Sequence, residues 1–257
     1  MLYNVEFLIG LYIAIFGCCI GSFLNVLIYR IPKKIPFWKG RSYCPSCKTQ
    51  IKPLDMIPIL SYLILRGKCR KCNSSISKRY PLVETLTGLI ALLVYWSCGF
   101  TLTALTYFTF SSILIVIAFI DIDTMTIPNG LIIALIVPAV SALFLIQQPG
   151  IIARIIGFFI ISLPMLIIAF IIPDGFGGGD IKLIAVCGFM LGWQNAIVAF
   201  LIGLIIGGIH GVFLLIKDKK NKGRHIAFGQ YLSIGIFVAL LYGNNIIGTY
   251  LSFFGLK

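Results

Sequence analysis

Charged side chains are scarce in this chain, and carboxylates are the scarcest of them. Charged residues make up 11% of its 257 residues, and only eight are Asp or Glu, whereas a soluble domain carries about 25% charged residues. Hydrophobic residues reach 59%, and the mean hydropathy is +1.03. Long apolar segments recur along nearly the whole length, so the composition excludes an ordinary soluble domain and predicts a polytopic membrane protein.

Histidine is also nearly absent, which limits the catalytic mechanisms that the chain could use. The two histidines are His210 and His225, so no Ser-His-Asp set competes for a catalytic role, and no HExxH motif is present. His210 lies in an apolar run, where a packing role is expected, and His225 ends a basic loop and needs no special role. The few carboxylates are left as the candidates for catalysis.

Basic residues gather in two stretches. Thirteen of the 21 Lys and Arg lie between Arg30 and Arg79, and five more lie between Lys217 and Arg224. Cytoplasmic loops of membrane proteins collect Lys and Arg, so both stretches are expected in the cytosol. Neither stretch shows the interleaved aromatics or the recognisable module of a nucleic-acid-binding protein, so we expect no nucleic-acid partner.

The apolar runs predict an all-α protein with about eight transmembrane helices. The first run has no Lys or Arg before it and Arg30, Lys33 and Lys34 after it, which is the reverse of a secretory signal and places its N-terminal end outside. The run 181–193 is short and could fuse with 195–216, but only eight helices put both basic stretches in the cytosol. The eight runs are 7–29, 81–98, 103–120, 130–147, 151–172, 181–193, 195–216 and 227–254.

This topology divides the chain into three parts. A first transmembrane helix at 1–29 is followed by a cytosolic insertion at 30–80 and a seven-helix membrane core at 81–257. Both termini are then outside, and the loops near 99–102 and 148–150, also outside, contain no charge. Five of the eight acidic residues fall at cytosolic positions: Asp121, Asp123, Asp174, Asp180 and Asp218.

The insertion contains two CxxC motifs, CPSC at 44–47 and CRKC at 69–72, which stand 21 residues apart. The spacing is typical of a closed, structural zinc site with four thiolate ligands, here Cys44, Cys47, Cys69 and Cys72. Two disulfides are the alternative, but the cytosol keeps thiols reduced, and neighbouring Lys and Arg favour the thiolate. The other four cysteines lie in apolar runs and are expected to pack as small hydrophobes.

Asp180 follows three consecutive glycines in FGGGD at 176–180 and directly precedes an apolar run. One interpretation is a helix N-cap, a position that suits Asp and that the helix dipole reinforces. A cap does not require the three glycines, which permit positive φ and the close approach of another backbone. The sequence therefore also indicates a site that accepts an extended peptide.

Asp121 and Asp123 end another apolar run, in FIDID at 119–123. A solvated helix end is the simple interpretation, although a helix C-terminus disfavours negative charge. Two positions apart, the side chains point to different sides of a helix, so either one of them could face Asp180. Paired carboxylates with a water between them hydrolyse peptide bonds. A proton-coupled transporter is the alternative, but a proton relay would place its acids near the membrane midplane rather than at one edge.

These motifs together resemble the type IV prepilin peptidases, membrane aspartic peptidases that mature pilins and pseudopilins. The resemblance is collinear over nearly the whole chain and includes both CxxC motifs, IDID ahead of IP, and the GxGD motif that ends at Asp180. The other matching segments are GSFLNVLIYRIP at 21–32, SKRYPLVE at 77–84, FGGGDIKL at 176–183 and FGQYLSIG at 228–235.

The resemblance implies a catalytic pair of Asp121 and Asp180, and it selects Asp121 over Asp123. It implies cleavage of a short basic leader after glycine, at the cytosolic face of the bacterial plasma membrane, in prepilins or pseudopilins of a type IV pilus or protein secretion system. It also implies N-methylation of the new N-terminus with S-adenosylmethionine. Gly67 and Lys68, next to Cys69, are candidates for the methyl-donor site.

Two carboxylates held close together are expected to share one proton. Asp180 stands at a helix N-terminus and Asp121 at a helix C-terminus, so the dipoles of these two helices predict that Asp180 is ionised and Asp121 is protonated. The chain departs from the family pattern at Asn129, Ala227 and Gln230, where many members carry aspartate and two prolines. None of these is a catalytic position, so the departures bear on substrate preference more than on activity.

Overall fold

The structure is a computed structural model that describes residues 2–38, 40–172, 175–217 and 227–255. Asp174, His225 and most of the second basic stretch, with Asp218, lie outside these residues. Helices dominate the described chain, and its only β pairing consists of two isolated antiparallel bridges, Tyr43–Gln50 and Lys68–Ser75. The prediction of an all-α protein is confirmed.

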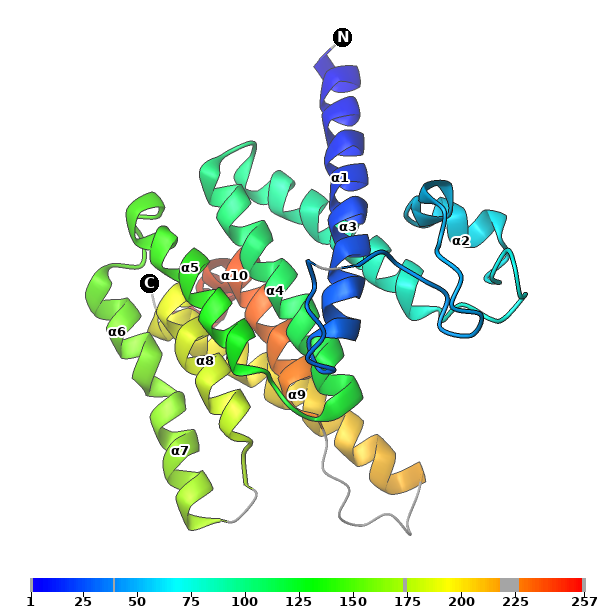
Figure 1. Cartoon of the computed structure of the whole chain (residues 1–257). Coiled ribbons are helices and arrows are strands. Elements are labelled where there is room, and N and C mark those ends of the chain that lie inside the picture. The colour runs from blue at the N-terminus through cyan, green and yellow to red at the C-terminus, as the bar shows by residue number, and fades with distance from the viewer. Residues whose placement is uncertain (1, 39, 173–174, 218–226, 256–257) are drawn as a thin grey trace. The chain divides into compact units, whose positions relative to one another are not determined.

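Ten α-helices and one short 3-10 helix make up the described chain (Figure 1). In chain order they are α1 Leu2–Arg30, η1 Pro53–Met56, α2 Leu60–Ile64, α3 Arg79–Cys98, α4 Leu102–Thr124, α5 Asn129–Leu145, α6 Ile151–Ile160, α7 Ser162–Ile171, α8 Gly178–Leu191, α9 Trp193–Lys217 and α10 Gly229–Phe253. By its internal contacts the chain forms two compact units, Met1–Ala104 and Leu105–Lys257.

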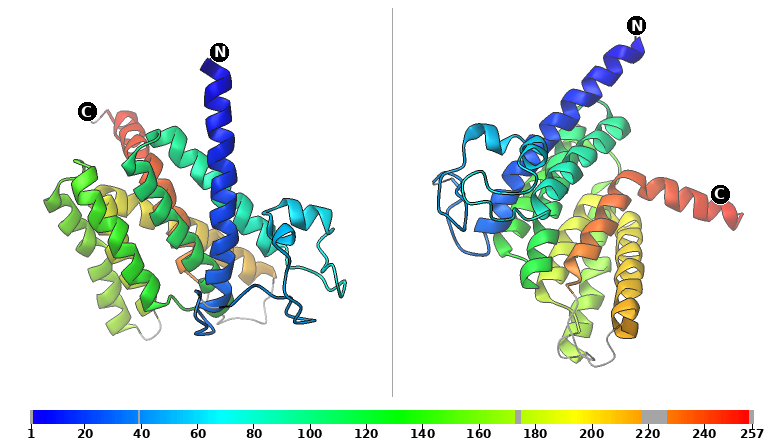
Figure 2. Two further views of the ribbon diagram at one scale, coloured as in Figure 1. Left: turned by 45° about the horizontal axis from the view of Figure 1, so that its top comes forward. Right: turned by 90° about the vertical axis from the view of Figure 1, so that its right-hand side faces the viewer.

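The first unit is built on the pairing of α1 with α3, which lie side by side (Figures 1 and 2). Small residues let the two backbones meet. A Cβ added to Gly21 would lie 2.7 Å from Cα of Glu84, and one added to Gly88 would lie 2.6 Å from Sγ of Cys18. Close approach through small residues is the common way in which membrane helices associate.

Polar contacts tie the 31–78 segment to this helix pair. The backbone N–H of Ile59 donates to Oε2 of Glu84 in α3 at 2.8 Å. At the end of α1, Nη1 of Arg30 donates to the carbonyl of Pro36 at 3.0 Å. The insertion is therefore fixed to the helix pair at inner points and not only at its two ends.

Helix α8 is the centre of the second unit. It contacts α5, α6, α7, α9 and α10, and Leu183, Ile184 and Cys187 are fully buried. The backbones of α6 and α8 touch, because a Cβ added to Gly188 would collide with the carbonyl oxygen of Gly157. A helix that is covered on all sides is expected to be apolar all round, which explains the unbroken apolar sequence of this helix after Lys182.

The short run 181–193 does not fuse with the run that follows it. Gly192, between α8 and α9, has a φ of +76°, and its amide donates to the carbonyl of Gly188 at 2.8 Å. This left-handed C-cap is readily adopted only by glycine. The structure confirms the break between these two helices that the charge pattern predicts.

Six segments are long and apolar enough to cross a membrane: Glu6–Arg30, Arg79–Cys98, Leu102–Thr124, Ile151–Ile171, Trp193–Lys217 and Gly229–Phe253. The fourth combines α6 with α7. Helix α5 has 17 residues and α8 has 14, so both are shorter than a usual span. Each of the eight predicted apolar runs corresponds to helix, but a count of eight bilayer crossings stays a prediction.

The second unit contains one buried cation that the sequence gives no reason to single out. Arg154 is 1% exposed, and its guanidinium donates to backbone carbonyls at the C-terminal ends of α5 and α8. Its partners are Pro149 at 2.9 Å, Met190 at 3.0 Å, Ile146 at 3.2 Å, Ala142 at 3.3 Å and Phe189 at 3.4 Å. A cation at two helix C-termini interacts favourably with the carbonyls of the last turns and with the dipoles of both helices.

Candidate active site and metal centre

In the second unit, Asp121 and Asp180 lie close enough for their charges to interact. Asp121 lies in the last turn of α4 and is 4% exposed, whereas Asp123 is exposed. Asp180 lies in the first turn of α8, outside the six candidate spans. Burial, and secondly the charge of Asp121, raise the pKa of Asp180 to about 7. The structure therefore couples Asp180 to Asp121, the partner that the family resemblance selects.

Each carboxylate of the pair keeps one oxygen available for chemistry. Oδ2 of Asp121 and Oδ1 of Asp180 are buried and have no hydrogen-bond partner among the described residues. Buried polar atoms are normally satisfied by protein or by ordered water, so an unpartnered pair calls for an explanation. Two such atoms on neighbouring acids suit a water or a peptide carbonyl between them.

Ile127, in the loop after α4, joins the two halves of the site. A Cβ added to Gly179 would lie 2.9 Å from Cβ of Ile127. A Cβ added to Gly229 would lie 2.9 Å from Cδ1 of Ile127 and 2.8 Å from Oδ2 of Asp121. The first turns of α8 and α10 thus pack against the same side chain, and this contact brings the ends of three helices together around the carboxylates.

The first turn of α10 faces Asp121. The backbone amides of Gly229 and Gln230 interact with its carboxylate, so the positive end of the α10 dipole points at this acid. The prediction that Asp121 holds the shared proton considered only the dipoles of α4 and α8. The contacts with α10 and the raised pKa of Asp180 favour the opposite assignment, with Asp121 ionised and Asp180 protonated.

The glycines before Asp180 act through close packing rather than through an unusual backbone. The N-cap of α8 is Gly177, with a φ of −67°, so Asp180 is three residues inside the helix and is not the N-cap. No residue from Gly177 to Gly179 has a positive φ. The structure contradicts the interpretations of an Asp180 N-cap and of left-handed glycines. Gly179 instead packs against the side chain of Ile127, and the approach of an extended peptide backbone to these glycines stays a prediction.

Tyr231 and His210 form a polar contact beside the pair that the sequence does not reveal. The Tyr231 hydroxyl shares a short hydrogen bond with Nδ1 of His210, which links α10 to α9. Tyr231 is buried and lies close enough to Asp121 for an electrostatic interaction between the two side chains. His210 is therefore a hydrogen-bonded residue as well as a packing residue. The sequence marks this region by the FGQYLSIG segment at 228–235 and by the departures at Ala227 and Gln230, and none of these signals indicates the contact between Tyr231 and His210.

The four cysteines of the insertion converge in the first unit. Their Sγ atoms all lie within 4.8 Å of one another, and Sγ of Cys44 lies 3.8 Å from Sγ of Cys72. Tetrahedral Zn–S bonds of about 2.3 Å would separate the sulfurs by about 3.8 Å. All eight cysteines are free thiols. The cluster can therefore hold one tetrahedral metal ion, and the disulfide alternative is not the arrangement that the structure adopts.

The two CxxC motifs fold as matching turns. In the first turn, the amide of Cys44 donates to the carbonyl of Thr49 at 2.9 Å. In the second turn, the amide of Cys69 donates to the carbonyl of Ser74 at 2.8 Å. The residue after each second cysteine has a φ of +56°. Hydrogen bonds, first from the backbone of Cys47 and then from Ser74, lower the pKa of Cys44 to about 6. A thiolate is the form that ligates metal.

Gly67 and Lys68 occupy the turn that leads into the second CxxC motif. Gly67 has a φ of +69°, and a Cβ there would lie 2.9 Å from the hydroxyl oxygen of Tyr62. Its carbonyl accepts the amide of Ile76 at 2.7 Å. These contacts explain a glycine at this position by the fold of the turn, and the role of both residues toward a methyl donor stays a prediction.

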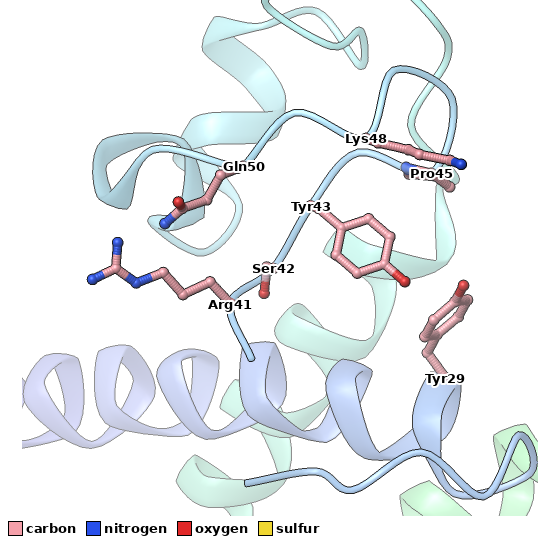
Figure 3. Close-up of a pocket in the computed structure, with 7 residues that line it drawn as sticks. All are labelled: Tyr29, Arg41, Ser42, Tyr43, Pro45, Lys48 and Gln50. Atoms are coloured by element: carbon pink, nitrogen blue, oxygen red, sulfur yellow. The ribbon is translucent and has the colours of Figure 1, made fainter. Parts of the chain in front are cut away.

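A pocket of about 570 Å³ opens beside the first CxxC motif (Figure 3). Its lining includes Tyr29 from the end of α1 and Arg41, Tyr43, Lys48 and Gln50 from the insertion. Figure 3 shows the hydroxyl groups of the two tyrosines facing each other, with Arg41 and Gln50 extending on another side. Gly67 and Lys68 do not line it. The pocket combines cationic, aromatic and amide groups.

Two family models match the chain in succession. Residues 15–98 match the bacterial peptidase A24 N-terminal domain, and residues 108–212 match the type IV leader peptidase family. The first contains the cysteine cluster and the pocket, and the second contains Asp121 and Asp180. The two matches therefore separate the metal centre from the carboxylate pair along the sequence.

Curated relatives match over almost the whole chain. A prepilin leader peptidase/N-methyltransferase of Pseudomonas aeruginosa is 34% identical over 94% of this chain and 93% of its own length. Relatives with the same name are 35% identical in Bacillus subtilis, over 92% of this chain and 96% of their own length, and 31% identical in Legionella pneumophila, over 98% of both. No solved structure matches the chain. The resemblance seen in the sequence is confirmed, and the chain belongs to the type IV leader peptidase family.

Proposed function

We propose that the chain is a membrane aspartic endopeptidase that cleaves the short basic leader of type IV prepilins or pseudopilins and then N-methylates the new N-terminus. The observation that carries the proposal is the pairing of Asp121 with Asp180 through electrostatic coupling, each with a buried oxygen left unpartnered. The names of the relatives, prepilin leader peptidase/N-methyltransferase, support both activities.

The contacts around the pair define a role for each acid. Ionised Asp121, held by the first turn of α10, accepts a proton from a water that attacks the scissile carbonyl carbon. Protonated Asp180 donates to the carbonyl oxygen as its negative charge develops. When the tetrahedral intermediate collapses, the C–N bond breaks and the departing amine takes the proton that Asp121 holds. As the C=O bond re-forms, the hydroxyl made from the carbonyl oxygen returns its proton to Asp180. The pair then again shares one proton.

The cytosolic face of the bacterial plasma membrane is the proposed location of this chemistry. The six apolar spans support a multi-pass protein in the lipid bilayer. The thirteen Lys and Arg between Arg30 and Arg79 support a cytosolic insertion by the positive-inside rule. With that orientation the C-terminal end of α4 and the N-terminal end of α8, which carry the two acids, are cytosolic as well.

Purified full-length protein in detergent tests the proposal directly. A synthetic prepilin that carries its basic leader is incubated with the protein and S-adenosylmethionine, and the product is weighed by mass spectrometry. We expect loss of the leader and a gain of one methyl group on the new N-terminus. Cleavage without methylation would contradict the proposed methyltransferase activity and support the peptidase activity alone. An intact prepilin, together with proton-coupled uptake by the same protein in liposomes, would favour the transporter instead.

Zinc is the metal that we propose for the four-cysteine cluster, and elemental analysis tests it. We expect purified protein to contain close to one zinc ion per chain, and Cys44→Ser or Cys72→Ser to lose most of it, because a structural site needs all four ligands. Cys98→Ser is the matched control, since Cys98 ends α3 and is not part of the cluster. Metal-free wild type, or equal loss in the control, would contradict the assignment.

A further inference from the structure

Residues 53–65, which include η1 and α2, form a short apolar run within the basic insertion. The run reads PLDMIPILSYLIL and contains no Lys or Arg. Its one charge, on Asp55, is paired with Arg70, whose Nη2 lies 2.7 Å from Oδ1 of Asp55. An apolar run of about 10–14 residues is too short to cross a bilayer, and it is typical of a buried core helix or of a segment that enters the membrane interface.

The exposure of this run argues against a buried core helix. Among the described residues, neither η1 nor α2 contributes a buried side chain. Leu54 is 75% exposed and Ile64 is 73% exposed. An extended apolar surface of this kind marks a contact with a membrane or with another protein. The large apolar side chains that the run exposes are Leu54, Met56, Ile57, Leu60, Leu63 and Ile64.

A contact with α3 fixes the run at the depth of the membrane spans. The backbone N–H of Ile59, the N-cap of α2, donates to Oε2 of Glu84 at 2.8 Å. Glu84 lies five residues after Arg79, the first residue of the candidate span Arg79–Cys98. A helix rises 1.5 Å per residue, so Glu84 is about 7.5 Å inside this span along its axis. Interfacial helices bury their apolar face to a similar depth, about 5–10 Å.

Helix α1 indicates the same depth. A Cβ added to Gly21 would lie 2.7 Å from Cα of Glu84, and Gly21 lies nine residues before the end of the candidate span Glu6–Arg30. Helix α2 therefore begins level with residues that are inside both spans. Figures 1 and 2 show α2 beside the C-terminal half of α1 rather than beyond its end. The exposed apolar side chains are thus at the level where these spans meet lipid.

Exposed cations flank the run on both sides and favour one kind of partner. Lys48 and Lys52 precede the run, and Arg66, Lys68 and Lys71 follow it. Lys and Arg close to a bilayer surface attract anionic lipids, and their long side chains reach the headgroups from an anchored backbone. The same cations would repel the basic leader of a prepilin. An apolar centre with cationic flanks therefore suits an anionic bilayer better than the substrate.

We propose that residues 53–65 form a re-entrant segment, which enters the leaflet where α1 ends and α3 begins and leaves it on the same side. Its apolar side chains contact lipid acyl chains, and the flanking cations contact anionic phosphate headgroups. The CxxC motifs at 44–47 and 69–72 stay in the water, so the insertion is anchored to the membrane between its two metal-binding turns as well as at its ends. The proposal does not depend on leader cleavage.

Site-specific photo-crosslinking of the full chain in lipid nanodiscs tests the proposal. The photoreactive residue p-benzoylphenylalanine replaces Leu63, and mass spectrometry identifies the molecules that it captures. Leu89, which is 53% exposed within the span of α3, is the reference that faces lipid. Ser46, exposed in the first CxxC turn, is the reference that faces water. We expect position 63 to capture lipid in a yield close to that of position 89, and position 46 to capture none.

Changes at Ile64 test whether the capture of lipid depends on an apolar surface. Ile64→Glu should lose most of the lipid adduct at position 63, because a carboxylate is costly among acyl chains, whereas Ile64→Met should keep it. Ile64 is 73% exposed, so both variants should keep the melting temperature of the wild type. Nanodiscs that contain anionic phosphatidylglycerol should give more adduct than zwitterionic nanodiscs, because the flanking cations attract anionic headgroups.

Other outcomes would overturn the proposal. A lipid yield at position 63 no higher than at position 46 would contradict insertion, as would an unchanged yield in Ile64→Glu. Capture of an added synthetic prepilin, or of a second copy of the chain, in place of lipid would identify a protein-docking face instead. Equal yields in anionic and zwitterionic nanodiscs would contradict the role of the flanking cations. Failure to cleave prepilin would count against the proposed function and not against the re-entrant segment.

Discussion

Replacing Asp121 or Asp180 by Asn is expected to abolish leader cleavage while the protein stays folded and metal-loaded. Asn has the same shape as Asp but can neither accept the proton of the attacking water nor donate one to the carbonyl. General acid and base groups contribute about 10²–10⁴-fold each, so either variant should lose at least about a hundredfold in kcat. Cleavage of a synthetic prepilin, followed by mass spectrometry, measures the loss.

Asp123→Asn is the matched control for this experiment. Asp123 lies on the same helix two residues beyond Asp121 but is exposed, so its variant should keep most of the activity. The melting temperature in detergent reports whether each variant is folded, because the metal cluster lies in the other compact unit and its zinc content reports on that unit alone. If Asp121→Asn cleaves normally and Asp123→Asn is inactive, the partner of Asp180 is Asp123 and not Asp121. Activity in all three variants would rule out an aspartic mechanism.

The pH dependence of kcat/KM locates the shared proton. If Asp180 must be protonated in order to donate, the rate should fall as the pH rises through its pKa of about 7. The contact of Asp121 with the α10 amides stabilises the ionised form. A rate that instead rises through pH 7 would mean that Asp180 acts as the base, as the dipoles of α4 and α8 alone predict.

Local chemistry is what the sequence could reveal. The four cysteines are recognisable because the metal needs a fixed spacing within each turn. Asp121, Asp123 and Asp180 are recognisable as candidates because carboxylates are rare in an apolar chain, and the family resemblance selects Asp121 over Asp123. The separation of the run 181–193 from the run 195–216 followed from the charge pattern, although the pattern did not identify Gly192 as the break. Each of these features depends on a short segment or on a composition that can be read without knowledge of packing.

Contacts between distant segments could not be predicted in this way. Ile127 is one apolar residue among many, and only the packing of α8 and α10 makes it the link between the two acids. Arg154 is distinguished by carbonyls from three segments that converge on it. The contacts that bear on the charge assignment within the pair were hidden for the same reason, because the helix that faces Asp121 begins more than 100 residues further along the sequence.

Two glycine variants test whether this packing controls catalysis. Gly229→Ala would place a Cβ 2.8 Å from Oδ2 of Asp121, and Gly179→Ala would place one 2.9 Å from Cβ of Ile127. Contacts this short force a neighbour to move, and here the neighbours are a carboxylate oxygen of Asp121 and the residue that joins both halves of the site. A misplacement of about 1 Å can cost about a hundredfold in rate, so both variants should lose about that much in kcat.

Gly178→Ala is the matched control, because a Cβ at Gly178 would meet nothing within 4 Å. None of Gly178, Gly179 and Gly229 has a positive φ, so alanine brings no backbone strain at any of them and should even favour helix, by up to about 1 kcal/mol. A slow Gly179→Ala beside a fully active Gly178→Ala, both with a melting temperature in detergent no lower than that of the wild type, would therefore trace the loss to the contact with Ile127. Equal activity in all three variants would show that the close approach of α8 and α10 does not position the carboxylates.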